Sequence, residues 1–126
     1  MATIKAPSMH NRMYVGAQGN LSMAFAAVTL KAAAVATVVE MLDVPIGISV
    51  TGVRVNTSGL GAGAKVDIKL GETLLEANVD VSAAASLSIA LPTTYTEEKA
   101  VLTATIKGAA ATGKLEINPE YVATGY

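Results

Sequence analysis

Cysteine and tryptophan are absent from this 126-residue sequence, and histidine occurs once, as His10. Without cysteine the chain has no disulfide, no thiolate nucleophile and no cysteine-based zinc site. A single histidine also excludes metal sites that are built from several imidazoles. The residues therefore predict no catalytic residue, no metal site and no cofactor, and we expect the protein not to be an enzyme.

A surplus of positive charge is also lacking. Nine Lys and Arg residues stand against ten Asp and Glu residues, which gives a formal net charge of -1. Because neutralising phosphates by bulk charge requires an excess of cations, we expect no direct binding of nucleic acid. Aromatic residues make up only 4% of the chain, too few for a platform on which bases or sugars stack.

The longest apolar run is interrupted. Residues 23–39 are apolar or carry small hydroxyl groups except for Lys31, and a lysine at the centre of a span costs about 2.5 to 3.5 kcal/mol on insertion scales. We therefore expect no contact with a membrane. A secretory signal peptide is a stronger alternative than a membrane span, because Lys5 and Arg12 precede the apolar run and residues 34–36 resemble a cleavage site. Lys31 nevertheless interrupts the apolar part of such a signal too.

What the sequence has in excess is small apolar side chains. Hydrophobic residues make up 52% of the chain and charged residues only 15%. A chain of this length forms one domain, whose core does not need so much apolar surface. We therefore expect some of that surface to be buried against other subunits, in a homo-oligomer such as a dimer or trimer or against another protein.

From residue 44 onward apolar and polar residues alternate, with Gly or Pro between the runs. A period of two is typical of antiparallel strands with one buried face. The pattern predicts an all-β fold, either an antiparallel β-sandwich of seven or eight strands or a small closed barrel. Pro92 and Pro119 are expected to end strands. The apolar runs cover residues 46–50, 53–55, 66–70, 75–81, 87–91, 100–106 and 115–117, and residues 35–41 are counted as a further strand.

Residues 65–70 and 75–81 are expected to form a hairpin. A two-residue loop would set Asp67 opposite Glu76, and like charges directly opposite each other are unfavourable. We therefore predict a four-residue loop, residues 71–74. The opposed pairs are then Lys65 with Asp80, Val66 with Val79, Ile68 with Ala77 and Lys69 with Glu76.

The buried side of the chain changes parity at Gly52. The apolar residues before it, such as Ile48 and Val50, stand at even positions, whereas Val53 and Val55 stand at odd positions. One extra residue at this point would restore a common inner face. The sequence therefore predicts a β-bulge at Gly52.

The first residues follow neither pattern. Residues 1–20 show no sustained alternation and are expected to form an extended N-terminal arm, laid across its own domain or on a neighbouring chain, while residues 21–126 form the sandwich. Residues 21–28 fit a helix or a strand equally well. As interface residues we predict His10, Arg12, Tyr14 and Phe25, because none belongs to a catalytic pattern and an aromatic ring suits a contact surface.

Five stretches carry a resemblance to a known class of proteins. They are Val44–Val55, Leu60–Ile68, Leu74–Leu75, Ala111–Ile117 and Glu120–Val122. In these stretches the chain resembles small structural proteins of tailed bacteriophages, namely capsid decoration (cement) proteins and minor head proteins. The resemblance implies a β-sandwich on the outside of an icosahedral head, present as a symmetric oligomer, with its N-terminal arm over neighbouring capsid subunits.

For function, the resemblance implies a virion protein that decorates and stabilises the capsid by bridging subunits of the major capsid protein. A structural protein of the phage tail or tail tube is the first alternative. A receptor- or carbohydrate-binding module is the second, and it would need a cluster of exposed aromatic residues.

Overall fold

The computed structural model describes residues 3–10, 12–13 and 20–123, which form ten strands and one short 3-10 helix. The predicted all-β class is confirmed. In chain order the elements are β1 (Thr3–Lys5), η1 (Pro7–His10), β2 (Leu21–Met23), β3 (Ala27–Ala33), β4 (Val38–Val44), β5 (Ile48–Ser58), β6 (Lys65–Leu70), β7 (Thr73–Asp80), β8 (Ala84–Tyr95), β9 (Ala100–Lys107) and β10 (Ala111–Ala123).

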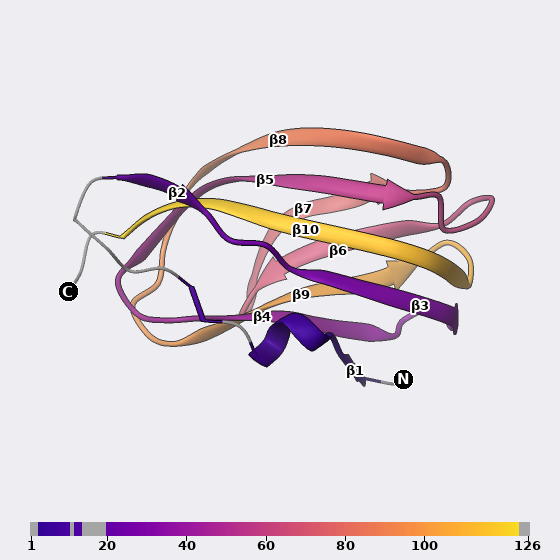
Figure 1. Cartoon of the computed structure of the whole chain (residues 1–126), viewed down its shortest axis with the longest axis horizontal. Helices are drawn as coiled ribbons and strands as arrows, with labels where there is room; N and C mark the ends of the chain where they lie inside the picture. The colour runs from indigo at the N-terminus through magenta and orange to yellow at the C-terminus, as the bar shows by residue number, and fades with distance from the viewer. Residues whose placement is uncertain (1–2, 11, 14–19, 124–126) are drawn as a thin grey trace.

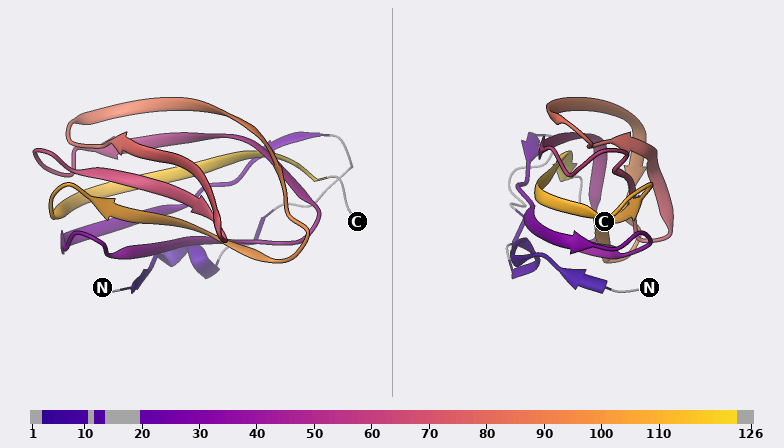
Figure 2. Two further views of the ribbon diagram at one scale, coloured as in Figure 1. Left: turned by 180° about the vertical axis from the view of Figure 1, so that it is seen from behind. Right: turned by 90° about the vertical axis from the view of Figure 1, so that its right-hand side faces the viewer.

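The strands form two sheets that lie face to face (Figures 1 and 2). One sheet has the order β1-β4-β9-β6-β7, and the other has the order β2-β10-β5-β8 with β3 also paired to β10. Because the sheets end separately at β7 and β8, the fold is a sandwich rather than a closed barrel. From β3 to β10, every connection except the β6–β7 hairpin crosses between sheets, which is the order of a jelly roll.

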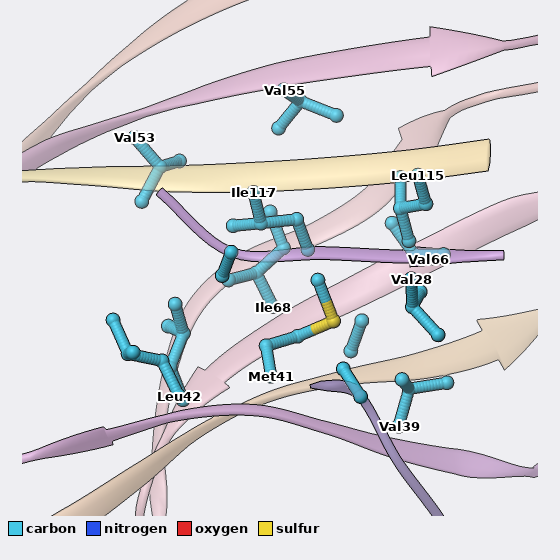
Figure 3. Packing of buried hydrophobic residues seen from close by; sticks show 14 of the residues in the cluster. Val28, Val39, Met41, Leu42, Val53, Val55, Val66, Ile68, Leu115 and Ile117 are labelled. Carbon is cyan, nitrogen blue, oxygen red and sulfur yellow. The ribbon is translucent and has the colours of Figure 1, made fainter. Parts of the chain in front are cut away.

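The core lies between the two sheets and consists of alternate residues from the strands that face each other. In β6, Val66, Ile68 and Leu70 are buried, whereas both lysines of the strand are exposed. The period of two in the sequence therefore marks the inner face correctly. Figure 3 shows the two layers meeting through Val39, Met41 and Leu42 of β4, Val53 and Val55 of β5, Val66 and Ile68 of β6, and Leu115 and Ile117 of β10.

The β6–β7 hairpin forms as predicted, but its register changes along its length. At the open end the predicted pairing of Lys65 with Asp80 is confirmed. At the turn Leu70 lies opposite Thr73, so the loop has two residues rather than the predicted four. The hairpin therefore combines the register of the longer loop at one end with that of the shorter loop at the other.

Two register shifts in β7 reconcile the ends of the hairpin. Glu76 lies opposite Ile68 rather than opposite Lys69, so that predicted pair is wrong. Asn78 has a positive φ of 54°, and its backbone N–H donates to Oδ1 of Asp67 at 2.8 Å. The repulsion that argued against a short loop does not arise, because the register shift between Ile68 and Lys69 places Glu76 opposite Ile68 and so moves Asp67 out of line with Glu76.

The predicted bulge at Gly52 is confirmed. Both strands that flank β5 change register beside Gly52: β10 does so between Glu120 and Tyr121, and β8 between the residues opposite Val50 and Gly52. Val50 and Val53 are both buried, so the extra residue restores the inner face. The position also needs glycine for space, since a Cβ there would lie 2.8 Å from the carbonyl oxygen of Ile89.

The two prolines do not end strands, so these predictions are wrong. Pro92 lies inside β8, where the register shift opposite Thr51 leaves it outside the regular ladder of an edge strand. Pro119 lies inside β10, and its carbonyl accepts the N–H of Ala24 at 3.1 Å. That face of Pro119 therefore points at the gap between β2 and β3, where its missing N–H costs no ladder hydrogen bond.

The described part of the N-terminal segment lies across its own domain, one of the two placements predicted for it. β1 pairs in parallel with β4, and the N–H of Ala6 donates to the carbonyl of Glu40 at 2.8 Å. Ala6 and Met13 are buried, and the hydroxyl of Ser8 donates to the carbonyl of Met41. The alternatives for residues 21–28 are also decided, because β2 and the start of β3 are strands.

Replacing Gly52 with alanine tests the bulge. The added Cβ would meet the backbone of β8, and we expect the free energy of unfolding to fall by about 1 to 3 kcal/mol, as for overpacked sites. Urea denaturation followed by circular dichroism measures the change. Ser49→Thr adds a methyl group at a half-buried position of the same strand, β5, and serves as the control. Equal stability of Gly52→Ala and the control would contradict the assignment.

Candidate functional site

Titratable side chains do not converge on a metal-like site in the part of the chain that the structure describes. No three His, Cys, Asp or Glu residues there are placed to hold a metal ion. Among the same residues, no helix has the length and apolar character needed to span a membrane. The predicted site is a contact surface, and its residues are located below.

His10 and Arg12 come together at one hollow. Both are exposed, at the end of η1 and just after it, and they line a depression of about 580 Å³ with Asp43, Ile46 and Lys99. Ile46 is 38% exposed at the turn between β4 and β5. The hollow thus presents several apolar side chains, Ile46 among them, beside two cationic groups and one carboxylate, which suits a protein surface with both apolar and acidic groups.

Phe25 lies beside the first residues of η1. It is 64% exposed and lines a hollow of about 260 Å³ with Pro7, Ser8 and Ala27. It does not line the hollow of His10 and Arg12. The structure therefore places the described interface residues in two separate hollows, with Phe25 at the start of η1 and His10 and Arg12 at its end. Tyr14 falls outside the described residues.

Phe25 belongs to a row of apolar side chains that points away from the core. Leu21 is 66% exposed, and Met23 and Phe25 line a second hollow of about 410 Å³ with Arg54 and Glu116 on the outer face of the sheet. Alternate residues of an extended chain share a face, so Leu21, Met23 and Phe25, here called the Phe25 row, project outward together. Sequence reasoning identified Phe25 but missed the other two, although the alternation in residues 21–27 was the signal.

The outward direction of the Phe25 row follows from hydrogen bonds on either side of it. The N–H of Ala26 donates to Oδ1 of Asn118 at 3.1 Å, and the N–H of Ile117 donates to the carbonyl of Ala26 at 2.9 Å. Asn118 is buried, with 3% of its surface exposed. Its side chain replaces a backbone acceptor where pairing is interrupted next to Pro119, which holds Ala26 inward and leaves Phe25 outside.

Asp80 is the one carboxylate with a clear electrostatic perturbation among the described residues. The hydroxyl and backbone N–H of Ser82 donate to its Oδ1 at 2.6 and 3.0 Å. These hydrogen bonds, assisted by Lys65, hold the pKa of Asp80 below its usual value. The bonded pair shapes the link from β7 to β8 and forms no cleft for chemistry.

Neither protein families nor curated proteins offer a match to this chain. Among solved structures, a chain in the capsid of Ralstonia phage GP4 superposes with a TM-score of 0.76 at 17% identity, over 99% of this chain and 99% of that one. A chain of the cyanophage Pam1 capsid asymmetric unit gives a TM-score of 0.66 at 18% identity, over 90% of this chain and 94% of that one.

A third similar structure is the acid-stable capsid of Helicobacter pylori bacteriophage KHP30. One of its chains gives a TM-score of 0.57 at 17% identity, over 86% of this chain and 92% of that one. At such identities the likeness shows a shared fold, and a fold by itself does not assign a function. The structural neighbours of this jelly roll are chains of bacteriophage capsids.

Asn118→Ala tests what holds the Phe25 row outward. The change leaves the buried N–H of Ala26 without its acceptor, and we expect a loss of about 1 to 3 kcal/mol in the free energy of unfolding. Hydrogen exchange at the Ala26 amide should become faster as well. Asn56→Ala, at a half-buried site on β5, is the matched control. If both variants kept the stability and exchange rates of the parent, the role assigned to Asn118 would be wrong.

Proposed function

We propose that the protein is a structural protein of a bacteriophage virion that decorates the outside of the capsid and stabilises it by bridging subunits of the major capsid protein. The likeness to a chain of the Ralstonia phage GP4 capsid carries the proposal, because it extends over 99% of both chains. The two other capsid chains with the same fold support it.

The exposed surfaces of the sandwich suit adhesion to other proteins. The Phe25 row offers apolar area beside the charged groups of Arg54 and Glu116. At the end of η1, the hollow of His10 and Arg12 adds cationic groups around Ile46. An apolar centre with a polar rim is the usual composition of a protein interface, and we assign both surfaces to contacts with the capsid.

The physical mechanism of stabilisation is preferential binding to the assembled shell. A protein that contacts two adjacent subunits at once binds the assembled pair but not the separated subunits. Its binding free energy therefore adds to the free energy needed to separate them. Each contact needs only modest strength, because icosahedral symmetry repeats it over the whole shell. Such a role requires no catalytic group, and the proposal assigns none.

Reconstitution tests this function and its surface together. Heads that lack the protein should take up the purified chain from solution, and the decorated heads should burst at a higher temperature than bare heads. Phe25→Ser should weaken uptake at least tenfold, since it removes the largest exposed side chain of the apolar row. Val35→Ser is the matched control, because Val35 is 50% exposed beyond the far end of β3.

Three outcomes would count against the proposal. Recovery of the protein from tails instead of heads would favour the tail alternative. Heads that bind the protein yet burst at the same temperature would contradict stabilisation while leaving the location intact. Equal uptake of Phe25→Ser and Val35→Ser would remove the Phe25 row from the interface.

A further inference from the structure

β8 differs from the other sheet edges of the molecule. It pairs with β5 along one side, and no strand in the described ranges pairs with its other side. From Ala84 to Ala90 it keeps a regular register with β5. This segment, Ala-Ala-Ser-Leu-Ser-Ile-Ala, has no charged residue, and all of it except the half-buried Ile89 is exposed. Figure 1 shows β8 as the long outermost strand of its sheet.

The remaining edges are protected in ways that discourage pairing. β7 carries Glu76 and Asp80 and is distorted by its two register shifts. The edge strands β1, which covers β4, and β2 have only three residues each, and β3 carries the exposed Lys31. Charges, bulges and covering segments are the means by which proteins keep sheet edges apart. The uncharged segment Ala84–Ala90 lacks all of them, so it has the properties of a pairing surface.

The segment is complementary to itself in an antiparallel arrangement. If Leu87 of one copy lies opposite Leu87 of another, Ser86 faces Ser88, Ala85 faces Ile89 and Ala84 faces Ala90. Residues that face each other then both have odd numbers or both have even numbers, and so lie on the same face of the sheet. Apolar side chains therefore meet on the inner face and serines meet on the outer face. Leu87, which is 36% exposed beside the core residue Val55, would gain cover from its own copy.

The ends of the segment also fit this register. Asp80 and Pro92 lie on either side of Ala84–Ala90, and with Leu87 at the centre each falls beyond the first or last residue pair. No charge is thus placed against another strand, and the missing N–H of Pro92 is not needed. A second copy therefore matches the edge in length, parity and charge at once.

We infer that β8 is a homodimer interface, in which two copies of the chain join edge to edge about a two-fold axis at Leu87. The two sheets β3-β10-β5-β8 become one continuous sheet across the axis. Such an isologous contact uses the same residues on both copies and closes after two. Backbone hydrogen bonds supply the pairing, and the inner apolar side chains supply the hydrophobic part. The inference does not depend on a role in the capsid.

Charge variants at the exposed positions Ser86 and Ser88 test the pairing and its register. Light scattering on a sizing column should give the wild-type chain twice its mass of 12.8 kDa. In S86E/S88E and in S86K/S88K every glutamate or lysine would face a like charge in the other copy, so each variant should have the single mass. Mixed together, the two variants should regain the double mass, because each glutamate then faces a lysine.

The mixed sample is also the control for folding, since a variant that had lost its strands could not restore the dimer. Circular dichroism of each variant should show the wild-type β signal. Self-pairing is wrong if the wild-type chain keeps the single mass at high concentration, if both like-charged variants dimerise, or if the mixture stays at the single mass. A single-mass wild-type chain whose uptake by heads is lost in S86E/S88E would overturn self-pairing and assign Ser86 and Ser88 to a contact with another protein, together with Met23 and Phe25, whose hollow they also line.

Discussion

The burial of two long central strands, β5 and β10, against the facing sheet is the constraint on which the rest of this structure depends. β10 pairs with β2, β3 and β5, and β5 pairs with β10 and β8, so both strands are fixed along nearly their whole length. Their inner residues, such as Val55 and Ile117, are fully buried. Since alternate residues must then face outward, the same apolar packing determines which side chains form the surface.

The surfaces to which we assign contacts arise where this regular pattern is interrupted. Pro119 cannot donate to the neighbouring strand, and there the chain separates into β2 and β3 with Asn118 supplying an acceptor. That interruption leaves the Phe25 row on the outside. At the opposite edge of the sheet, β8 keeps its ladder regular and uncharged from Ala84 to Ala90. One edge of the sheet thus presents side chains for contact, and the opposite edge, β8, presents backbone hydrogen-bonding groups.

Much of the sandwich could be predicted from the sequence, because inward and outward residues differ in polarity. The strand at residues 65–70 and the bulge at Gly52 follow from alternation and from its change of parity. The prolines misled the prediction, since only the three-dimensional pairing shows whether the missing N–H of Pro119 faces a partner. The hairpin loop was misjudged because a register shift between Ile68 and Lys69 can remove the charge conflict without lengthening the turn.

The candidate site was less predictable than the fold. That His10 and Phe25 line separate hollows at the two ends of η1 depends on where the N-terminal segment packs, which no local pattern reveals. The most direct test of the central claim is a cryo-electron microscopy reconstruction of virions that contain this chain. The account predicts jelly-roll density on the outer surface, above the joints between capsid subunits, in copy numbers set by icosahedral symmetry. Density for the chain inside the shell or in stacked rings along the tail, with bare capsid joints, would contradict it.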